Sequence, residues 1–332
     1  MKSLVVAGLS LALLVFPATW VTAAEASSTC ARPTPGYAYH WPIRPFDRQH
    51  PVRGAFGDPR IVSLTLPFGW TGPKQTDAYS FHNGVDIGAK PGTPVYPVVS
   101  GRVMRANTGQ IVVLTDDGRS FQYYHLTKAA AVQKGRCVVA YHTVLGWIRP
   151  GYEHVHLAEI DYHVVHNPLD RGHLEPYRDW TRPTATGLYL DDGSPPDKLA
   201  GRPLGPGDRL SVAVADQPPL PVSGDWYDLP EAPALVEWRL FHGNTRTAWQ
   251  VAVDFRHTQP PPWAFWNVYG AGTYQNCPQF EEHHYLGLPG RYLFRVHIQP
   301  SHLRPGVYRL AVRVTDIRGN RSTAWWPLRI VR

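Results

Sequence analysis

Charged residues and long apolar runs are both scarce in this chain. Of its 332 residues only 18% are charged and 43% are hydrophobic, a composition that can fill two globular cores and excludes a disordered or fibrous protein. Beyond the N-terminus no segment approaches the roughly 18 consecutive apolar residues of a membrane-spanning helix. The sequence also lacks a Gly-x-Ser-x-Gly nucleophile elbow and a phosphate-binding loop. We therefore look elsewhere for residues that carry chemistry.

The N-terminal segment has the pattern of a secretion signal. Lys2 precedes an apolar run at residues 4–16, and small residues around Ala24 and Ala26 suit cleavage, which predicts a signal peptide over residues 1–26. The mature chain is then expected to be soluble outside the cytoplasm, secreted or periplasmic, and to meet the membrane only through this signal during export. A formal charge of +7 suits contact with an anionic polymer such as a cell wall. Nucleic acid is not expected as a partner of an exported chain.

Cysteine occurs at only three positions, Cys30, Cys137 and Cys277. In an oxidising compartment this number predicts one disulfide and one remaining thiol. The sequence leaves open which two cysteines pair.

Turn-forming residues divide the chain. The 33 prolines, 29 glycines, 12 tryptophans and 17 tyrosines favour short strands joined by turns, so we expect a mainly β protein. A Pro-rich segment at residues 27–51 precedes a first domain at 52–166, in which residues 111–114, 121–125 and 154–160 are predicted strands. A Pro-rich connector at 167–206 leads to a second domain at 207–332.

Two histidine motifs can supply metal ligands. His82 and Asp86 are four residues apart, with Gly84 between them to let the backbone turn. His154 and His156 lie two residues apart in a predicted strand, so both imidazoles project to the same face. By themselves these spacings are also compatible with exposed histidines.

A third histidine, His125, lies in the run Tyr123-Tyr124-His125-Leu126 on another predicted strand. The alternative interpretation is a half-buried structural histidine. His142, His163 and His166 lie near these motifs in the sequence but belong to none, and we interpret them as structural. A separate acidic and histidine run at residues 281–284 is interpreted as solvated surface.

Taken in order, the motifs resemble the lysostaphin-type (LytM-like) zinc endopeptidases. The flanking residues fit as well, with Phe56-Gly57-Asp58-Pro59-Arg60 upstream and Asp86-Ile87-Gly88-Ala89, Gly92-Thr93-Pro94-Val95 and Gly101-Arg102-Val103 downstream. The resemblance covers roughly residues 52–160. It implies an antiparallel β peptidase domain that acts on wall peptides.

The resemblance also implies roles for five residues. His82, Asp86 and His156 would bind Zn²⁺ and leave one position open for water, while His125 and His154 would act as catalytic residues beside it. Which of the two takes the proton of the water stays open. The chain departs from the family at Ala158, where a carboxylate is usual and Glu159 follows instead, and in the short connection from Gly146 to His154. These departures concern the residues around the metal and the shape of the substrate groove.

The function implied is an exported zinc metalloendopeptidase that hydrolyses peptide bonds in peptidoglycan cross-links or stem peptides. The alternative is a non-catalytic LytM-like protein that binds the wall or activates other hydrolases. Retention of the three ligands and both further histidines favours the enzyme.

The second domain shows about seven β-like runs with the spacing of an antiparallel sandwich, at residues 209–216, 235–241, 249–255, 265–269, 292–298, 307–316 and 325–331. The last two, with Gly319-Asn320 in the turn, resemble the closing hairpin of immunoglobulin-like domains. We expect this sandwich to fold independently, and a chain ending near residue 200 to keep its hydrolytic activity. A third interpretation makes the sandwich the functional part. Its tryptophans at 263, 266, 325 and 326 would bind glycan or protein, although for most of them we expect core packing.

Overall fold

The computed structural model describes residues 30, 38–62, 78–107, 109–191, 197–199, 201–222, 229–270, 272–273 and 292–332. The signal segment, Cys277 and the run at 281–284 lie outside these residues. The described part is almost entirely β, in antiparallel sheets, so the mainly β prediction is confirmed. Among the described helices none is long and apolar enough to cross a membrane.

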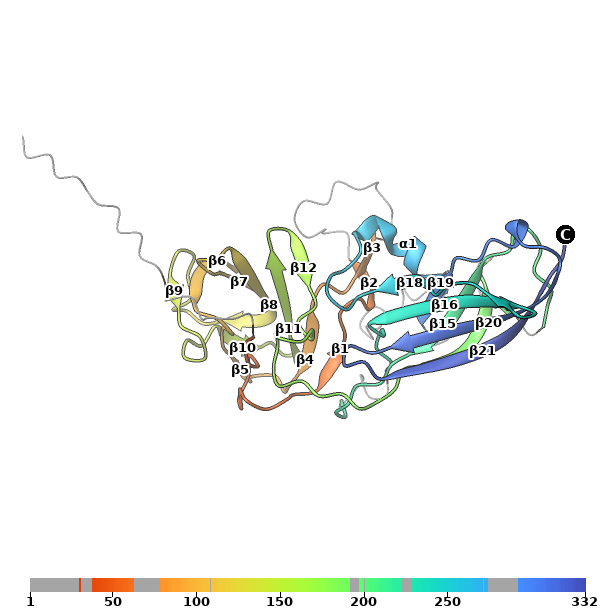
Figure 1. The fold of residues 1–332 in the computed structure, drawn as a ribbon. Helices are drawn as coiled ribbons and strands as arrows, with labels where there is room; N and C mark the ends of the chain where they lie inside the picture. Colours follow the sequence, from red (N-terminus) through yellow and green to blue (C-terminus); the bar gives the residue numbers. More distant parts are fainter. Residues whose placement is uncertain are drawn as a thin grey trace, which may run out of the picture.

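The N-terminal half is built on one large antiparallel sheet (Figure 1). Its main path runs β1-β4-β11-β8-β7-β6-β9, and β5, β10 and β12 pair at its margins. The strands are β1 (Val52–Gly54), β4 (Val85–Gly88), β5 (Pro94–Val95), β6 (Gly101–Asn107), β7 (Gly109–Leu114), β8 (Arg119–Lys128), β9 (Cys137–Val138), β10 (Gly146–Ile148), β11 (His154–Asp161) and β12 (Val164–His166). The three strands predicted in this half are therefore confirmed as β7, β8 and β11.

Residues 38–51 pack into the core of this half. Tyr39, Trp41 and Ile43 are buried in the same cluster as the central strands, and Trp41 has no exposed surface. Tyr39 also forms a parallel bridge with Leu174, beyond the sheet. A disulfide joins Cys30 to Cys137, which settles the pairing left open by the sequence.

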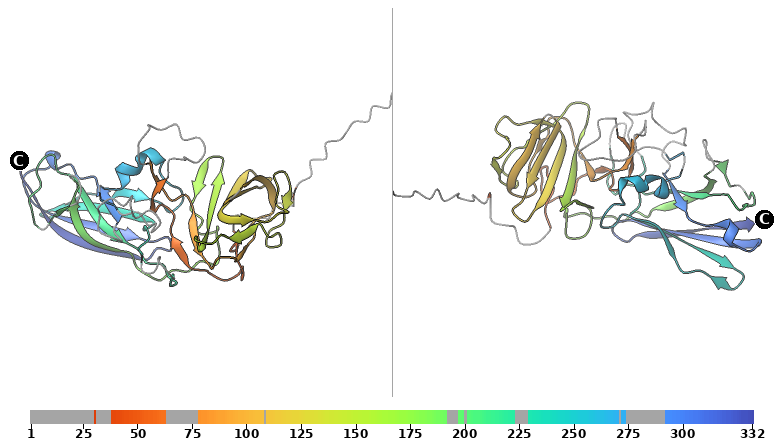
Figure 2. Two further views of the ribbon diagram at one scale, coloured as in Figure 1. Left: turned by 180° about the vertical axis from the view of Figure 1, so that it is seen from behind. Right: turned by 90° about the horizontal axis from the view of Figure 1, so that it is seen from above.

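The C-terminal half contains two antiparallel sheets that share one core (Figure 2). One has the order β14-β13-β15-β19, and the other has β17-β16-β20-β21 with β18 paired to β16. The strands are β13 (Thr184–Leu190), β14 (Asp197–Lys198), β15 (Leu210–Ala215), β16 (Leu235–His242), β17 (Thr245–Arg246), β18 (Gln250–Asp254), β19 (Tyr292–Val296), β20 (Gly306–Thr315) and β21 (Arg321–Ile330). β13 and β14 come from the segment expected to be a connector. The immunoglobulin-like assignment stays a prediction.

The strand predicted at residues 265–269 is wrong. This segment forms a 3-10 turn, η2 (Pro262–Ala264), followed by the short helix α1 (Phe265–Val268). Pro262 at the start of the turn fixes φ at a value suited to a helix. Proline also has no backbone N–H that could donate to a neighbouring strand. Phe265 and Tyr269 are four residues apart, so both project to the same side and enter the core.

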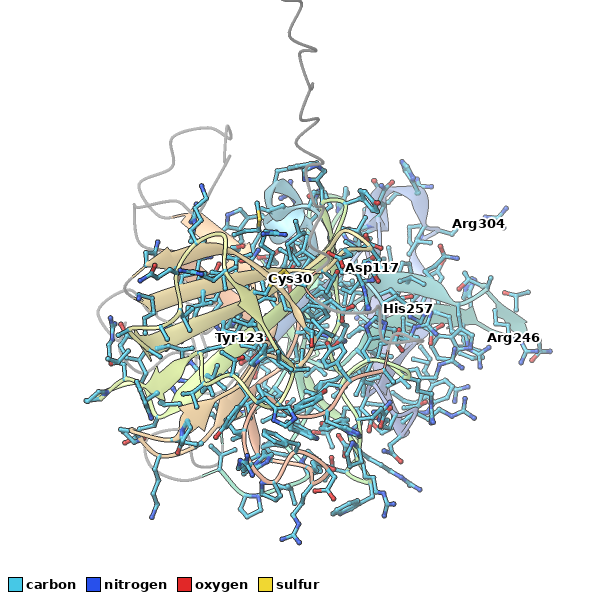
Figure 3. The ribbon with its side chains drawn as sticks, turned by 90° about the vertical axis from the view of Figure 1, so that its left-hand side faces the viewer. Cys30, Asp117, Tyr123, Arg246, His257 and Arg304 are labelled. Carbon is cyan, nitrogen blue, oxygen red and sulfur yellow. A yellow bond between two sulfur atoms is a disulfide. The ribbon has the colours of Figure 1, made fainter. Side chains whose placement is uncertain are left out.

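The aromatic residues of the sandwich divide between core and surface. Trp263 and Trp325 are 75% and 45% exposed, whereas Trp266 and Trp326 pack partly buried against the core. Arg246 and Arg304 project outward from this half in Figure 3, whereas Tyr123 lies within the N-terminal sheet. A second 3-10 turn among the described residues, η4 (Pro300–His302), precedes β20.

The two halves meet through the short sheet of β2 (Pro59–Val62) and β3 (Ala78–Phe81), which lies beside α1 (Figure 1). Phe81 is 2% exposed, and its ring centroid lies 5.5 Å from those of Phe255 and Phe265. The Tyr269 hydroxyl donates to the carbonyl of Gly57 at 2.7 Å. Gly57 has φ of +91°, and a Cβ there would lie 2.5 Å from the Phe255 ring. The N-terminal half therefore contributes side chains to the C-terminal core.

Candidate metal centre

Three elements bring His82, Asp86 and His156 together. His82 directly follows β3, Asp86 is the second residue of β4, and His156 lies directly opposite Asp86 in the pairing of β11 with β4. Gly84 makes the turn possible, because a Cβ there would lie 2.3 Å from the Leu157 carbonyl and 2.8 Å from Nε2 of His156. The absence of a side chain at this position gives the His156 imidazole its place.

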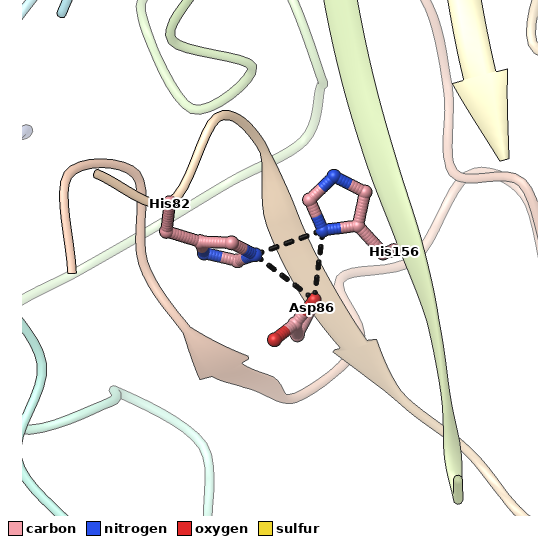
Figure 4. A group of neighbouring side chains, drawn as sticks. All are labelled: His82, Asp86 and His156. Carbon is pink, nitrogen blue, oxygen red and sulfur yellow. Dashed lines mark hydrogen bonds and ion pairs between the residues drawn. The ribbon is translucent and has the colours of Figure 1, made fainter. Parts of the chain in front are cut away.

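The three donor atoms form a small triangle (Figure 4). Nε2 of His82 lies 2.8 Å from Nδ1 of His156 and 3.1 Å from Oδ1 of Asp86, and the third edge is 3.0 Å. All three residues are buried, at 4 to 6% exposed. Donors bound tetrahedrally to one zinc ion lie about 3.3 Å apart. The donor set and its dimensions therefore fit zinc.

Hydrogen bonding and charge prepare these side chains to act as ligands. Nδ1 of His82 donates to the carbonyl of Ala55 at 2.8 Å, which leaves the lone pair on Nε2 directed at the triangle. Burial and the nearby Arg60 lower the pKa of His82 to about 4, so its imidazole is neutral at pH 7. Burial alone would raise the pKa of Asp86, but the adjacent imidazoles outweigh it and hold that pKa well below its usual value.

His154 and His125 lie beside the triangle. Nε2 of His154 is 3.5 Å from Oδ1 of Asp86, and Nδ1 of His154 donates to the carbonyl of Tyr152. The His125 ring centroid lies 4.5 Å from that of His154. Burial lowers the pKa of His154 to about 4 and that of His125 to about 2, so both rings are neutral at pH 7.

His125 has an unusual backbone conformation. Its φ is +66°, and the register of β7 with β8 shifts where it lies opposite, so one residue of β8 bulges out of the ladder. A bulge re-aims the side chain it carries, and such strained residues concentrate at functional sites. Regular strand alternation would place the His125 side chain on the opposite face from Tyr124. The bulge turns it toward His154 instead.

Tyr152 is a site residue that the sequence reasoning missed. Its ring stacks on His125 with centroids 4.3 Å apart and planes 18° from parallel, and the Arg149 guanidinium lies 4.3 Å from its centroid. Its carbonyl fixes the tautomer of His154. The only sequence signal was the departure of the short 146–154 connection from the family pattern, which gave no role to any one residue.

Arg60 and Asp58 extend the site toward the C-terminal half. Nη2 of Arg60 donates to Oδ2 of Asp86 at 3.2 Å, and Nη1 donates to Oδ2 of Asp58 at 3.4 Å. The other oxygen of Asp58 accepts from the backbone N–H of Ala232 at 2.7 Å. Burial raises the pKa of Asp58 to about 6. A continuous chain of contacts thus joins the sandwich to the candidate ligand Asp86.

Glu159 has a structural role away from the triangle. It has no exposed surface, and its Oε2 accepts from the Tyr39 hydroxyl and approaches Nδ1 of His173, each at 2.7 Å. In β11 it alternates with His156 and Ala158, so it faces the other side of the sheet. The carboxylate usual in the family after the last ligand is therefore not replaced by Glu159.

The fold and site define an antiparallel β domain with a buried His/Asp/His cluster that could hold a metal ion. Residues 80–157, the segment that carries this centre, match the sequence model of peptidase family M23. None of the curated proteins compared with the chain matches it.

Several solved structures are similar to the chain over part of its length. A zinc-containing peptidase from Vibrio cholerae is 21% identical, over 38% of this chain and 37% of that one, with a TM-score of 0.27. The catalytic domain of the prophage-encoded M23 protein EnpA from Enterococcus faecalis, in a mutant form, is 20% identical over 38% and 88%, with a TM-score of 0.25. The SpoIIQ–SpoIIIAH pore-forming complex contributes a chain that is 20% identical over 40% and 89%, with a TM-score of 0.29.

Proposed function

We propose that the protein is an exported zinc-dependent endopeptidase that hydrolyses peptide bonds in peptidoglycan, in its cross-links or stem peptides. The observation that carries this proposal is the buried triangle of His82, Asp86 and His156, with two neutral histidines beside it, inside a segment that matches an M23 peptidase. Three protein ligands leave one coordination position open, as hydrolytic zinc sites require.

The protein residues have distinct roles in this proposal. When bound, zinc acidifies a coordinated water and polarises the scissile carbonyl. His154 accepts a proton at Nε2, because its Nδ1 hydrogen is held by the Tyr152 carbonyl. His125, held against the Tyr152 ring, donates a hydrogen bond to the oxyanion that develops during attack.

The alternative is a non-catalytic wall-binding or hydrolase-activating protein. Loss of a ligand would favour it, but the described site retains all three ligand residues together with His125 and His154. Only activity separates the two functions, since both permit zinc binding.

The test is to measure zinc in the purified mature protein and to analyse by mass spectrometry the products released from purified peptidoglycan. We expect one zinc per chain and cleaved peptides with new amino and carboxyl termini. His156→Ala should abolish both, while His142→Ala, which changes an exposed histidine, should abolish neither. Zinc-loaded protein that releases no peptide would support the non-catalytic alternative.

For export, the N-terminal sequence of protein recovered outside the cytoplasm should begin near residue 27.

A further inference from the structure

A second cluster of metal-binding groups lies where the connector meets the sandwich. It consists of Asp179 in the connector, Asp216 directly after β15, and Asp316 in the turn between β20 and β21. One carboxylate oxygen from each lies within 4.8 Å of the others. Asp216 and Asp316 are 6% and 1% exposed. Three carboxylates from distant parts of the sequence thus converge, those of Asp216 and Asp316 buried and that of Asp179 partly exposed.

Glu231 adds a fourth carboxylate with an unpaired oxygen. It forms an antiparallel bridge with Asp216, with backbone hydrogen bonds in both directions at 2.9 and 3.0 Å. Residues directly opposite in such a bridge project side by side on one face, so the Glu231 side chain points to the same side as that of Asp216. Glu231 is 4% exposed, and no donor among the described residues reaches its Oε1.

The described donors to the three aspartates are neutral, and Arg60, whose guanidinium binds Asp58 and Asp86, favours the charged form of Glu231. Backbone N–H groups donate to Asp216 and Asp316, and Thr181 donates to Asp179. No lysine or arginine of the described residues forms an ion pair with any of the four carboxylates, and the nearby Arg318 instead binds Glu175. Burial, together with the neighbouring carboxylates, raises the pKa of Asp216, Glu231 and Asp316.

We propose that Asp179, Asp216 and Asp316, with Glu231 beside them, form a calcium-binding site. Calcium takes six to eight oxygen ligands at about 2.3 to 2.6 Å, so two oxygens on one ion lie up to about 5 Å apart, which accommodates the observed spacing. The cluster has only oxygen donors, which disfavours zinc, and magnesium demands a tighter octahedron and retains its water. Zinc at the first site and calcium at the second would therefore not compete.

Calcium here would stabilise the junction of the two halves. It would fix the connector, through Asp179, to the end of β15 and to the β20–β21 turn. Glu231 is followed by Ala232, whose N–H donates to Asp58, the residue that contacts Arg60. Ordering this segment would support the chain of contacts that reaches Asp86.

The test is to titrate calcium into the zinc-loaded full-length protein in calcium-depleted buffer, by calorimetry and by thermal unfolding. Calcium modules of low affinity have Kd values of about 1 mM, so the titration should extend to about 10 mM. We expect one saturable calcium site per chain and a rise in Tm with calcium. Magnesium at the same concentrations should produce a smaller rise.

Two isosteric variants, Asp216→Asn and Asp179→Asn, make the test specific. In each, the oxygen that accepts from a backbone N–H is kept, and the new amide takes the place of the other oxygen, which in Asp179 accepts from the Tyr177 hydroxyl at 3.4 Å. Without calcium these variants should be at least as stable as the unmodified protein, because one of several neighbouring carboxylates is gone. They should no longer respond to calcium. Asp116→Asn, at an exposed turn, should respond normally.

His156→Ala should also keep the calcium response, which separates this site from the zinc centre. The proposal is overturned if the unmodified protein shows neither saturable binding nor a Tm rise at about 10 mM calcium. It is overturned equally if both Asn variants keep the full response.

Discussion

Replacement of Phe81 by alanine tests whether the sandwich helps to build the metal centre. Phe81 directly precedes the candidate ligand His82, and its ring packs on Phe255, Phe265 and Tyr269 of the C-terminal half. At 2% exposed it is a core residue, and a buried Phe→Ala change costs about 3 to 5 kcal/mol. If about a third of this loss, about 1.4 kcal/mol, comes from poorer positioning of the His82 side chain, zinc affinity decreases about tenfold.

The assay combines zinc affinity, by competition with a chromogenic chelator, with urea unfolding. Trp325→Ala is the matched control, because it removes a half-exposed aromatic of the same sandwich away from the shared core and should leave zinc affinity unchanged. Phe81→Leu should recover most of the loss, since it restores apolar volume. Wild-type zinc affinity in a folded but destabilised Phe81→Ala variant would refute the idea that the sandwich positions His82.

Further predictions concern the centre and its supports. His156→Ala should lose stoichiometric zinc by elemental analysis, and retention would show that the ligand set is different. His154→Ala or His125→Ala should keep zinc but cleave peptide at least about a hundredfold more slowly, and unchanged turnover in either would remove its proposed role. Contrary to the expectation from sequence alone, a chain ending near residue 200 should lose activity and zinc affinity, because it uncovers the Phe81 contacts; an active, zinc-loaded truncation would restore the modular interpretation. Cys137→Ser should lower Tm, because the disulfide closes a separation of 107 residues and such loops contribute about 4 to 5 kcal/mol, and unchanged Tm would exclude this contribution.

The core of the site could be predicted because its signals are local. His82 and Asp86 flank a glycine turn, and His154 and His156 share a strand face by simple alternation. The structure brings all four together, with His125 beside them. The zinc ligands and catalytic roles themselves stay proposals.

What the sequence did not predict depends on distance along the chain. Asp58 meets Ala232 across 174 positions, and no periodic pattern reports such a contact. The bulge at His125 depends on the register of a neighbouring strand. The short apolar run at 265–269 has no period that separates strand from helix, and only the preceding prolines distinguish them. The pairing of Cys30 with Cys137 likewise requires three-dimensional proximity.

The placement of residues 38–51 has a consequence for how the protein could be activated. Many exported proteases are made as zymogens whose leading segment is cut away to open the active site. Here Tyr39, Trp41 and Ile43 are core residues, and the Tyr39 hydroxyl binds Glu159 on the side of β11 opposite His156. Removing this stretch would expose the apolar interior without uncovering the candidate metal centre. Loss of the Trp41 side chain alone would lower the free energy of unfolding by about 3 to 5 kcal/mol. A maturation cut compatible with a folded protein must therefore fall before residue 38.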